Sequence, residues 1–160
     1  MSADYRLAPE HPYPAALRDV TAAYRALAGQ ADGAGHVVVS GESAGGNLAI
    51  ELLISGKEEG LTMPAAALLL SPMTDLTVTG SSYAGKAHAD PAISAQAIRT
   101  RAADYLAGTD TDQRRIRRAM ADLCRITSWE TPIRLILLPL MRPPDVGSRR
   151  TGKSCVVIAG

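Results

Sequence analysis

The chain has 160 residues, of which 46% are hydrophobic and 21% are charged. This balance is typical of a globular protein and excludes disorder of the whole chain, and the length fits one domain with a sizeable core. Only two cysteines are present, Cys124 and Cys155, which excludes a disulfide-rich scaffold.

The formal net charge of +1 is the sum of two unlike parts. Residues 1–113 carry seven basic and thirteen acidic residues, a net charge of −6, whereas residues 114–160 carry ten basic and three acidic residues, a net charge of +7. Charge asymmetry of this kind indicates a tail or a second module. We therefore predict a folded part over residues 1–113 and a basic tail over residues 114–160.

The first half of the chain reads as a helix followed by a strand, a helix and a second strand. Apolar residues at helical spacing predict a helix over 15–28, with Gly29 as its stop. A β-branched run predicts a buried strand over 36–40, helical spacing returns over 47–55, and a second apolar run predicts a strand over 65–70. Such a strand–helix–strand succession indicates a parallel sheet with a right-handed crossover.

The rest of the chain carries weaker patterns. Residues 75–90 are rich in glycine, serine and threonine and predict a loop, and residues 93–106 again have helical spacing. In the tail, residues 133–141 could form a strand, but Pro139 interrupts them. We expect an α/β fold, with a mainly parallel sheet flanked by helices and an irregular basic tail.

No transmembrane span or secretory signal is visible. The longest apolar stretch, residues 133–141, is far shorter than the roughly 20 residues that a bilayer needs. The first six residues contain no apolar run of the kind that a signal peptide carries. We therefore expect a cytoplasmic protein with reduced thiols.

Residues 41–45, Gly-Glu-Ser-Ala-Gly, match the pattern G-x-S-x-G and stand between a predicted strand and a predicted helix. In that context a serine is held on a sharp turn with its hydroxyl exposed at the carboxyl edge of the sheet. Ser43 is therefore the candidate nucleophile, and the Ala44 amide is the candidate oxyanion donor. Gly41, Glu42, Gly45 and Gly46 complete this candidate nucleophile elbow. A side chain two residues to either side of Ser43, at Gly41 or Gly45, would collide with the neighbouring backbone.

A serine nucleophile needs a base, usually histidine, and an acid that orients the base. In the order typical of this motif the histidine comes last, but His11 and His36 both precede Ser43. His88 follows Ser43, yet it lies in a polar loop and nothing in the sequence fixes its geometry, so we interpret it as a solvated loop residue. The sequence therefore contains a candidate nucleophile without an assigned base.

Three stretches together resemble one family. Residues 4–19 begin Asp-Tyr-Arg-Leu-Ala-Pro-Glu, residues 41–49 read Gly-Glu-Ser-Ala-Gly-Gly-Asn-Leu-Ala, and residues 69–76 read Leu-Leu-Ser-Pro-Met-Thr-Asp-Leu. In this order they resemble the hormone-sensitive-lipase-like α/β-hydrolases, a group of bacterial carboxylesterases and lipases. The resemblance covers residues 4 to about 110 and implies a partial α/β-hydrolase fold.

The resemblance implies ester hydrolysis through an acyl-enzyme on Ser43, with short acyl esters or small lipids as substrates. It implies neither a cofactor nor a metal. Two features of the family are not found in this sequence: the His-Gly-Gly-Gly loop that precedes the first matching stretch, and the catalytic Asp and His that follow the last one. We therefore expect weak activity or none, and we hypothesise that this is a truncated or frameshifted hydrolase joined to an unrelated tail.

Two features of the tail suggest other functions. Residues 147–154 fit the phosphate-binding pattern G-x-x-x-x-G-K-[ST], but that loop must follow a strand and open a helix, and here Pro143 and Pro144 precede it and a β-branched run follows. The basic cluster at residues 114–118 supports the alternative of a non-catalytic binding or regulatory fragment that contacts nucleic acid or an anionic surface. We do not expect nucleic-acid binding, because Trp129 is the only aromatic residue of the tail. A sheet without its first strands would also expose an edge that permits self-association.

Overall fold

The computed structural model describes residues 1–30, 33–85, 93–108, 134–138 and 154–158. Four helices and four strands follow one another in these ranges, together with a single 3₁₀ turn, η1 (Ala34–His36). The boundary that we predict at residue 113 lies outside the described residues, so it stays a prediction. None of the described helices combines the length and the hydropathy needed to cross a bilayer.

The first helix, α1 (Ala15–Ala28), has the bounds that the apolar spacing predicts, and Gly29 caps its carboxyl end. Leu17, Val20 and Tyr24 lie on its buried face, one or two turns apart. The Tyr24 hydroxyl donates a hydrogen bond to the carbonyl oxygen of Thr62 at 2.6 Å, which ties the helix to the segment that leads into the sheet. The helix is therefore anchored by both apolar packing and one polar contact.

The predicted strand–helix–strand unit is confirmed. Strand β1 (Val37–Glu42) leads without a spacer into α2 (Ser43–Glu58), and β2 (Ala66–Leu70) returns parallel to β1. The register pairs Val38 with Ala66 and Glu42 with Leu70. Both strands therefore end at the same edge of the sheet, next to the first residue of α2.

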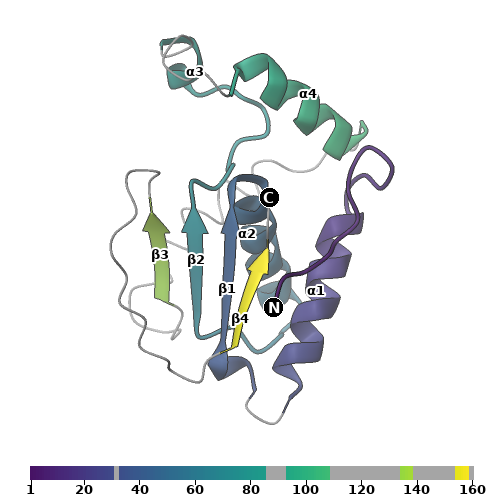
Figure 1. Ribbon diagram of the computed structural model, residues 1–160, viewed down its shortest axis with the longest axis vertical. Coiled ribbons are helices and arrows are strands. Elements are labelled where there is room, and N and C mark those ends of the chain that lie inside the picture. Colours follow the sequence, from purple (N-terminus) through teal and green to yellow (C-terminus); the bar gives the residue numbers. More distant parts are fainter. Residues whose placement is uncertain (31–32, 86–92, 109–133, 139–153, 159–160) are drawn as a thin grey trace.

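Two further strands come from the tail and lie at the two edges of the sheet (Figure 1). β3 (Arg134–Leu138) pairs parallel with β2, and β4 (Ser154–Ile158) pairs parallel with β1, so the order is β3-β2-β1-β4. We expected an irregular tail, but β3 ends before Pro139 and β4 coincides with the last β-branched run. These short apolar runs can pair because the parallel strands beside them supply their hydrogen-bonding partners.

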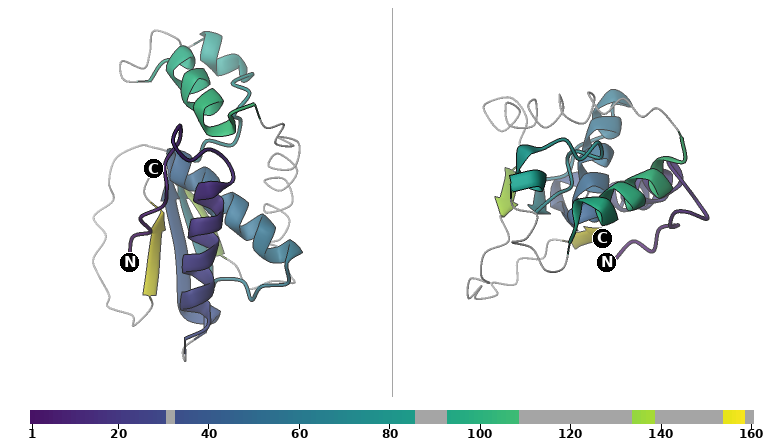
Figure 2. Two further views of the ribbon diagram at one scale, coloured as in Figure 1. Left: turned by 90° about the vertical axis from the view of Figure 1, so that its right-hand side faces the viewer. Right: turned by 90° about the horizontal axis from the view of Figure 1, so that it is seen from above.

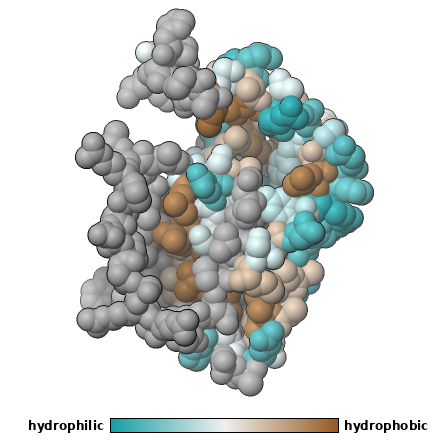
Figure 3. Space-filling view, viewed as in Figure 1, coloured by the Kyte–Doolittle hydropathy of each residue, from teal (hydrophilic) through white to brown (hydrophobic). Residues whose placement is uncertain are grey.

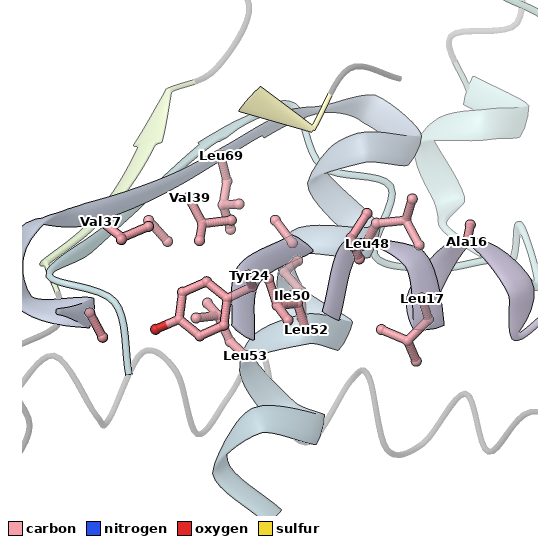
Figure 4. Close-up of a cluster of buried hydrophobic side chains, with 14 residues drawn as sticks. Ala16, Leu17, Tyr24, Val37, Val39, Leu48, Ile50, Leu52, Leu53 and Leu69 are labelled. Carbon is pink, nitrogen blue, oxygen red and sulfur yellow. The ribbon is translucent and has the colours of Figure 1, made fainter. Parts of the chain in front are cut away.

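The core lies between the sheet and the two longest helices. Val37, Val39 and Leu69 point from one face of the sheet toward side chains of α1 and α2 (Figure 4). Figure 2 shows both helices on that side of the sheet. Val38 of β1 and Ala66, Leu68 and Leu70 of β2 alternate with these buried residues and are half-buried. Figure 3 shows patches of hydrophobic surface on the side of the sheet away from the helices.

Two helices follow β2. α3 (Ser81–Gly85) is a short helix inside the segment that we predict as a loop, and α4 (Ala95–Leu106) starts two residues later than the predicted helix. The Ser94 hydroxyl accepts a hydrogen bond from the Ala97 amide at 3.1 Å, which is the usual capping contact at a helix start. Figure 1 shows α4 beyond the carboxyl edge of the sheet, above the start of α2.

Candidate active site

Ser43 stands where β1 ends and α2 begins, and its backbone is in the left-handed region with φ of +49°. A residue with a Cβ atom adopts this region at a cost of about 1–3 kcal/mol, and such strain concentrates at functional sites. Ser43 is half-buried and Ala44 is exposed, so this turn is accessible from outside. The motif predicts a sharp turn here, and in the structure β1 passes directly into α2 at Ser43.

Two glycines make room for the turn. A Cβ atom at Gly41 would lie 2.2 Å from the carbonyl oxygen of Gly45, and one at Gly46 would lie 2.8 Å from the Cβ of Pro72. Both separations are well below van der Waals contact. The chain therefore requires glycine at 41 because the helix start folds back over the strand end, and at 46 because a neighbouring loop crosses it.

The Ala44 amide is one of the unpaired donors at the start of α2, where the helix dipole is positive. Glu42 precedes the helix in an extended conformation, is exposed, and makes no capping hydrogen bond with its side chain. The Glu42 side chain therefore does not occupy the amides of the first turn. An oxygen that gains negative charge beside Ser43 would meet these amides.

The segment after β2, residues 71–75, packs against the elbow, and we call it the β2 loop. The Met73 amide donates to the carbonyl oxygen of Ser43 at 3.0 Å, and the Met73 carbonyl accepts from Nδ2 of Asn47 at 2.8 Å. Asn47 is 3% exposed and lies one turn after Ser43 on α2. The β2 loop is therefore joined to the first two turns of the elbow helix by hydrogen bonds in both directions.

A cavity of about 290 Å³ opens beside the elbow. Ala44, Asn47 and Leu48 of α2 form one side, and Met73 and Leu76 form a second side. The remaining sides come from two distant segments, residues 5–8 and the last two turns of α4, whose contributions are Arg101, Ala102 and Tyr105. Apolar atoms dominate this lining, as they do in pockets that hold small organic ligands.

Residues 5–8, which we call the amino-terminal wall, are held by an ion pair. The guanidinium of Arg6 binds both carboxylate oxygens of Asp19 on α1, at 2.8 and 2.9 Å, and the Arg6 amide donates to the same carboxylate at 3.0 Å. These hydrogen bonds lower the pKa of Asp19 to about 2. Because both side chains are substantially exposed, solvent screens the pair.

Tyr105 forms the cavity wall contributed by α4. Its ring meets the ring of Tyr13 edge-on, with centroids 5.7 Å apart and planes at 74°, and its carbonyl accepts from the Tyr13 amide at 2.7 Å. Burial, and then the nearby Glu51 carboxyl group, raise the pKa of the Tyr105 phenol far above its usual range. Tyr105 therefore acts as a neutral, packed wall at any pH at which the protein would be assayed.

The structure places no histidine side chain on the described lining of the cavity. His36 lies in η1 at the amino end of β1, and the six residues of that strand separate it from Ser43 by roughly 20 Å. His11 is exposed and acts electrostatically on Asp19. His88 lies outside the described residues, so the structure supplies no base for Ser43 from the parts of the chain that it describes.

Sequence reasoning missed the contacts that surround the elbow. Asn47 and the β2 loop stood inside the stretches that resemble the family, but their hydrogen bonds depend on two distant loops meeting at one sheet edge. A signal was present: Asn47 is an uncharged polar residue directly before the apolar run Leu48, Ala49 and Ile50, and buried amides need partners. Sequence reasoning also missed the ion pair that holds the amino-terminal wall, because Arg6 and Asp19 are thirteen residues apart.

Neither a metal site nor a nucleotide site emerges from the described ranges. No group of three or more His, Cys, Asp or Glu residues in those ranges could hold a metal ion. Residues 154–158, which would open the helix of a phosphate-binding loop, form strand β4 instead. The rest of that motif, residues 147–153, and the basic cluster at 114–118 lie outside the described residues.

Comparisons with known proteins agree with this geometry. A family model described as alpha/beta hydrolase fold matches residues 1–130. An acetyl-hydrolase of Streptomyces hygroscopicus is 41% identical over 106 residues, which are 66% of this chain and 36% of that protein. An esterase of Acinetobacter venetianus is 38% identical over 103 residues, which are 64% of this chain and 34% of that protein. The chain thus spans about a third of the length of these curated relatives.

Solved structures match a larger share of the chain. An esterase of the bacterial hormone-sensitive lipase family superposes with a TM-score of 0.71 at 29% identity, over 86% of this chain and 55% of that one. An esterase/lipase from an uncultured bacterium gives a TM-score of 0.69 at 34% identity, over 86% and 54% of the two chains. With the elbow, the parallel sheet and these relatives in agreement, the chain belongs to the hormone-sensitive-lipase-like group of the α/β-hydrolase fold family.

Proposed function

We propose that Ser43 is the nucleophile of a carboxylic-ester hydrolase reaction that runs through an acyl-enzyme. The observation that carries the proposal is the conformation of Ser43, at φ of +49° between a buried strand and a helix start that the preceding Glu42 side chain does not cap. Strain of this kind presents the hydroxyl to a ligand instead of burying it. The relatives named as esterases and acetyl-hydrolase support the same chemistry.

In this reaction the Ser43 Oγ forms a bond to the ester carbonyl carbon, and the Ala44 amide donates to the oxygen that becomes negative. The bond to the leaving oxygen then breaks, and the alcohol departs with the proton that the serine gave up. Water attacks the acyl-enzyme, releases the acid and restores the Ser43 hydroxyl. Gly41, Gly45 and Gly46 allow the sharp turn around Ser43, and Glu42 is the last residue of β1.

The substrate class follows from the cavity beside Ala44. Its volume of about 290 Å³ is at the lower end of the range for small-ligand pockets, and its lining is mainly apolar. A short acyl chain would fill it and would be attracted by the burial of its methylene groups. We therefore propose esters of short acyl groups as substrates, with no metal or cofactor taking part.

The expected turnover is low. The catalytic Asp and His that the family carries after the last matching stretch are not found in this sequence. Loss of triad members leaves a residual rate that comes from the oxyanion donors and from binding alone, which is about 10³ to 10⁴ above water. Slow acylation without rapid turnover is the behaviour that this set of residues supports.

The test is covalent labelling of the full chain with a small fluorophosphonate probe, followed by hydrolysis of p-nitrophenyl acetate. We expect stoichiometric labelling at Ser43 in the wild type, none in Ser43→Ala, and slow hydrolysis that the same substitution abolishes. Ser55→Ala, three turns along the same helix, is the matched control and should label as the wild type does. Labelling that is unchanged in Ser43→Ala would overturn the proposal.

Two wider statements belong to this proposal. We propose a cytoplasmic location, which fractionation of the producing cells tests. We also propose self-association through an open edge of the sheet, for which β3 and β4 are the edge strands in the described residues. A concentration-independent monomer mass in light scattering would argue against such pairing.

A further inference from the structure

We propose that Asn47 is a positioning residue: through the β2 loop, its side-chain amide holds the strained turn at Ser43 in its reactive conformation. The inference rests on the proposed role of Ser43 as a nucleophile. It concerns a residue one turn away from that serine, on the same helix.

The first step is the connection from Asn47 to Ser43. Nδ2 of Asn47 donates to the Met73 carbonyl at 2.8 Å, and the Met73 amide donates to the Ser43 carbonyl at 3.0 Å. One residue of the β2 loop therefore accepts from Asn47 and donates to Ser43. Asn47 fixes the position of Met73, and Met73 fixes the peptide that follows the strained φ of Ser43.

The second step is the environment of this contact. Asn47 is 3% exposed, so water does not compete for its amide. A buried amide that loses its partner keeps the full cost of its desolvation, whereas a solvated one does not. The β2 loop is therefore held to the elbow helix by a contact that is costly to break.

The third step is the close packing of the β2 loop against α2. A Cβ atom at Gly46 would lie 2.8 Å from the Cβ and 2.9 Å from the Cα of Pro72. Ser71, the first residue of the β2 loop, is itself in the left-handed region with φ of +41°. The loop thus approaches the helix as closely as a glycine permits, and Asn47 and Gly46 secure it from adjacent helix positions.

Strain at Ser43 persists only when its surroundings hold it there. If Asn47 no longer held Met73, the turn could relax toward ordinary backbone angles and turn the hydroxyl away from the Ala44 amide. Asn47 also lines the cavity, so a role in ligand binding alone is the alternative that the experiment must separate. Positioning alters the reactivity of Ser43, whereas lining alters the concentration at which a probe saturates.

The first measurement is the labelling of Ser43 by a small fluorophosphonate, resolved into a maximal rate constant and a half-saturating concentration. Asn47→Asp keeps the shape but places a carboxylate oxygen against the Met73 carbonyl. We expect its maximal rate constant to fall about tenfold, the equivalent of one hydrogen bond, with the half-saturating concentration changed by less than about twofold. A change confined to the half-saturating concentration would overturn the positioning role.

The second measurement does not depend on reactivity. We expect amide hydrogen exchange of Met73 to accelerate about tenfold in Asn47→Asp, while exchange of Val39 in the central strand stays as in the wild type. Leu53→Ala, a buried change two turns further along α2, is the control for general destabilisation and should not expose Met73 selectively. If the exchange rate of the Met73 amide is unchanged, or rises together with that of Val39, Asn47 does not hold the β2 loop in place.

A third variant tests whether the two helix positions act through the same loop. Gly46→Ala should push Pro72 away and lower the maximal labelling rate constant as Asn47→Asp does. The double variant should then lose less than the product of the two separate losses, because the loop can be released only once. Independent, multiplicative losses would contradict a shared route through the β2 loop.

Failure of this inference is distinguishable from failure of the proposed function. If wild-type Ser43 is not labelled, the nucleophile proposal is wrong, and the exchange of Met73 still decides whether Asn47 holds the loop. If Ser43 is labelled and the Asn47 variants label at the wild-type rate, the nucleophile proposal stands and the positioning role is wrong.

Discussion

The cavity has two sides that differ in how they are held. On the elbow side, the Asn47 side chain is hydrogen-bonded to the β2 loop, and a Cβ atom added at Gly41 or Gly46 would collide with neighbouring atoms. On the opposite side, the amino-terminal wall is held by the exposed pair of Arg6 and Asp19. We therefore expect the position of Ser43 to be insensitive to salt and pH. The shape of the cavity should respond to both, because salt screens the exposed ion pair and low pH neutralises Asp19.

The largest expected effect comes from Gly41→Ala, which attacks the elbow side. Its Cβ would lie 2.2 Å from the Gly45 carbonyl oxygen, and backbone cannot move aside as a flexible side chain can. We expect a loss of about 3 kcal/mol or more in the free energy of unfolding, together with loss of Ser43 labelling.

Gly35→Ala is the matched control for this change, because no atom lies within 4 Å of the added Cβ. Urea unfolding should place it within about 0.5 kcal/mol of the wild type. Equal stability of the two variants would show that the elbow is looser than the contact distances indicate.

A smaller loss of stability should follow from Tyr24→Phe, which removes the hydrogen bond between α1 and the segment that leads into β2. The Tyr24 hydroxyl donates to Thr62 at 2.6 Å, so we expect a loss of about 1 kcal/mol in urea unfolding at pH 7. Burial raises the pKa of Tyr24 to about 12, from an ordinary value near 10. The unfolded chain therefore ionises first, and wild-type stability should decline as the pH rises from about 10 to 12.

The Phe variant lacks this ionisation, so the stability difference between the two proteins should narrow over that alkaline interval. Ser43 labelling at pH 7 should be unaffected, because Tyr24 is not among the residues that line the cavity. If the difference in unfolding free energy between the two proteins stays constant from pH 9 to 12, the pKa of Tyr24 is not raised by folding.

The smallest effect on stability is expected from the amino-terminal wall. The pKa of Asp19 is lowered to about 2, below its ordinary value of about 3.9, so its contribution is present above about pH 4 and is lost as the pH falls through 2. Arg6→Ala should return the Asp19 pKa toward its ordinary value, measurable by NMR titration.

In the same variant the half-saturating concentration of the labelling probe should rise about two- to fivefold, with the maximal rate constant unchanged. High salt should raise the half-saturating concentration of the wild type toward that of the variant, because salt screens the exposed pair of Arg6 and Asp19. A fall in the maximal rate constant would mean that the wall and the elbow are not independent.

Much of this arrangement could be predicted from the sequence because the relevant signals are local. The periodic apolar residues predict α1 with its true bounds, and a β-branched run followed at once by a glycine-rich turn predicts the elbow. The backbone collision that we expected at Gly41 is confirmed, and the collision of a Gly46 side chain with Pro72 is a further finding of the structure. Each of these features depends on residues within a few positions of one another.

The missed features are long-range. Asn47 meets Met73 across 26 residues, and the cavity combines segments that begin at Tyr5 and end at Tyr105. Spacing along the chain cannot predict which loops converge above one edge of a sheet. The tail strands were left open or unassigned for a related reason: residues 133–141 could form a strand but contain Pro139, and a five-residue apolar run forms a strand only where a neighbouring strand offers hydrogen-bonding partners.

The register of the sheet carries a consequence for the order of folding. Val38 pairs with Ala66, 28 residues later, whereas Val37 pairs with Ser154, 117 residues later. Closing the longer loop costs roughly 1 kcal/mol more in chain entropy, and distant pairings form late. The strained serine turn is thus encoded within the nearer pair, so it can be assembled before the last strand has reached its place beside β1.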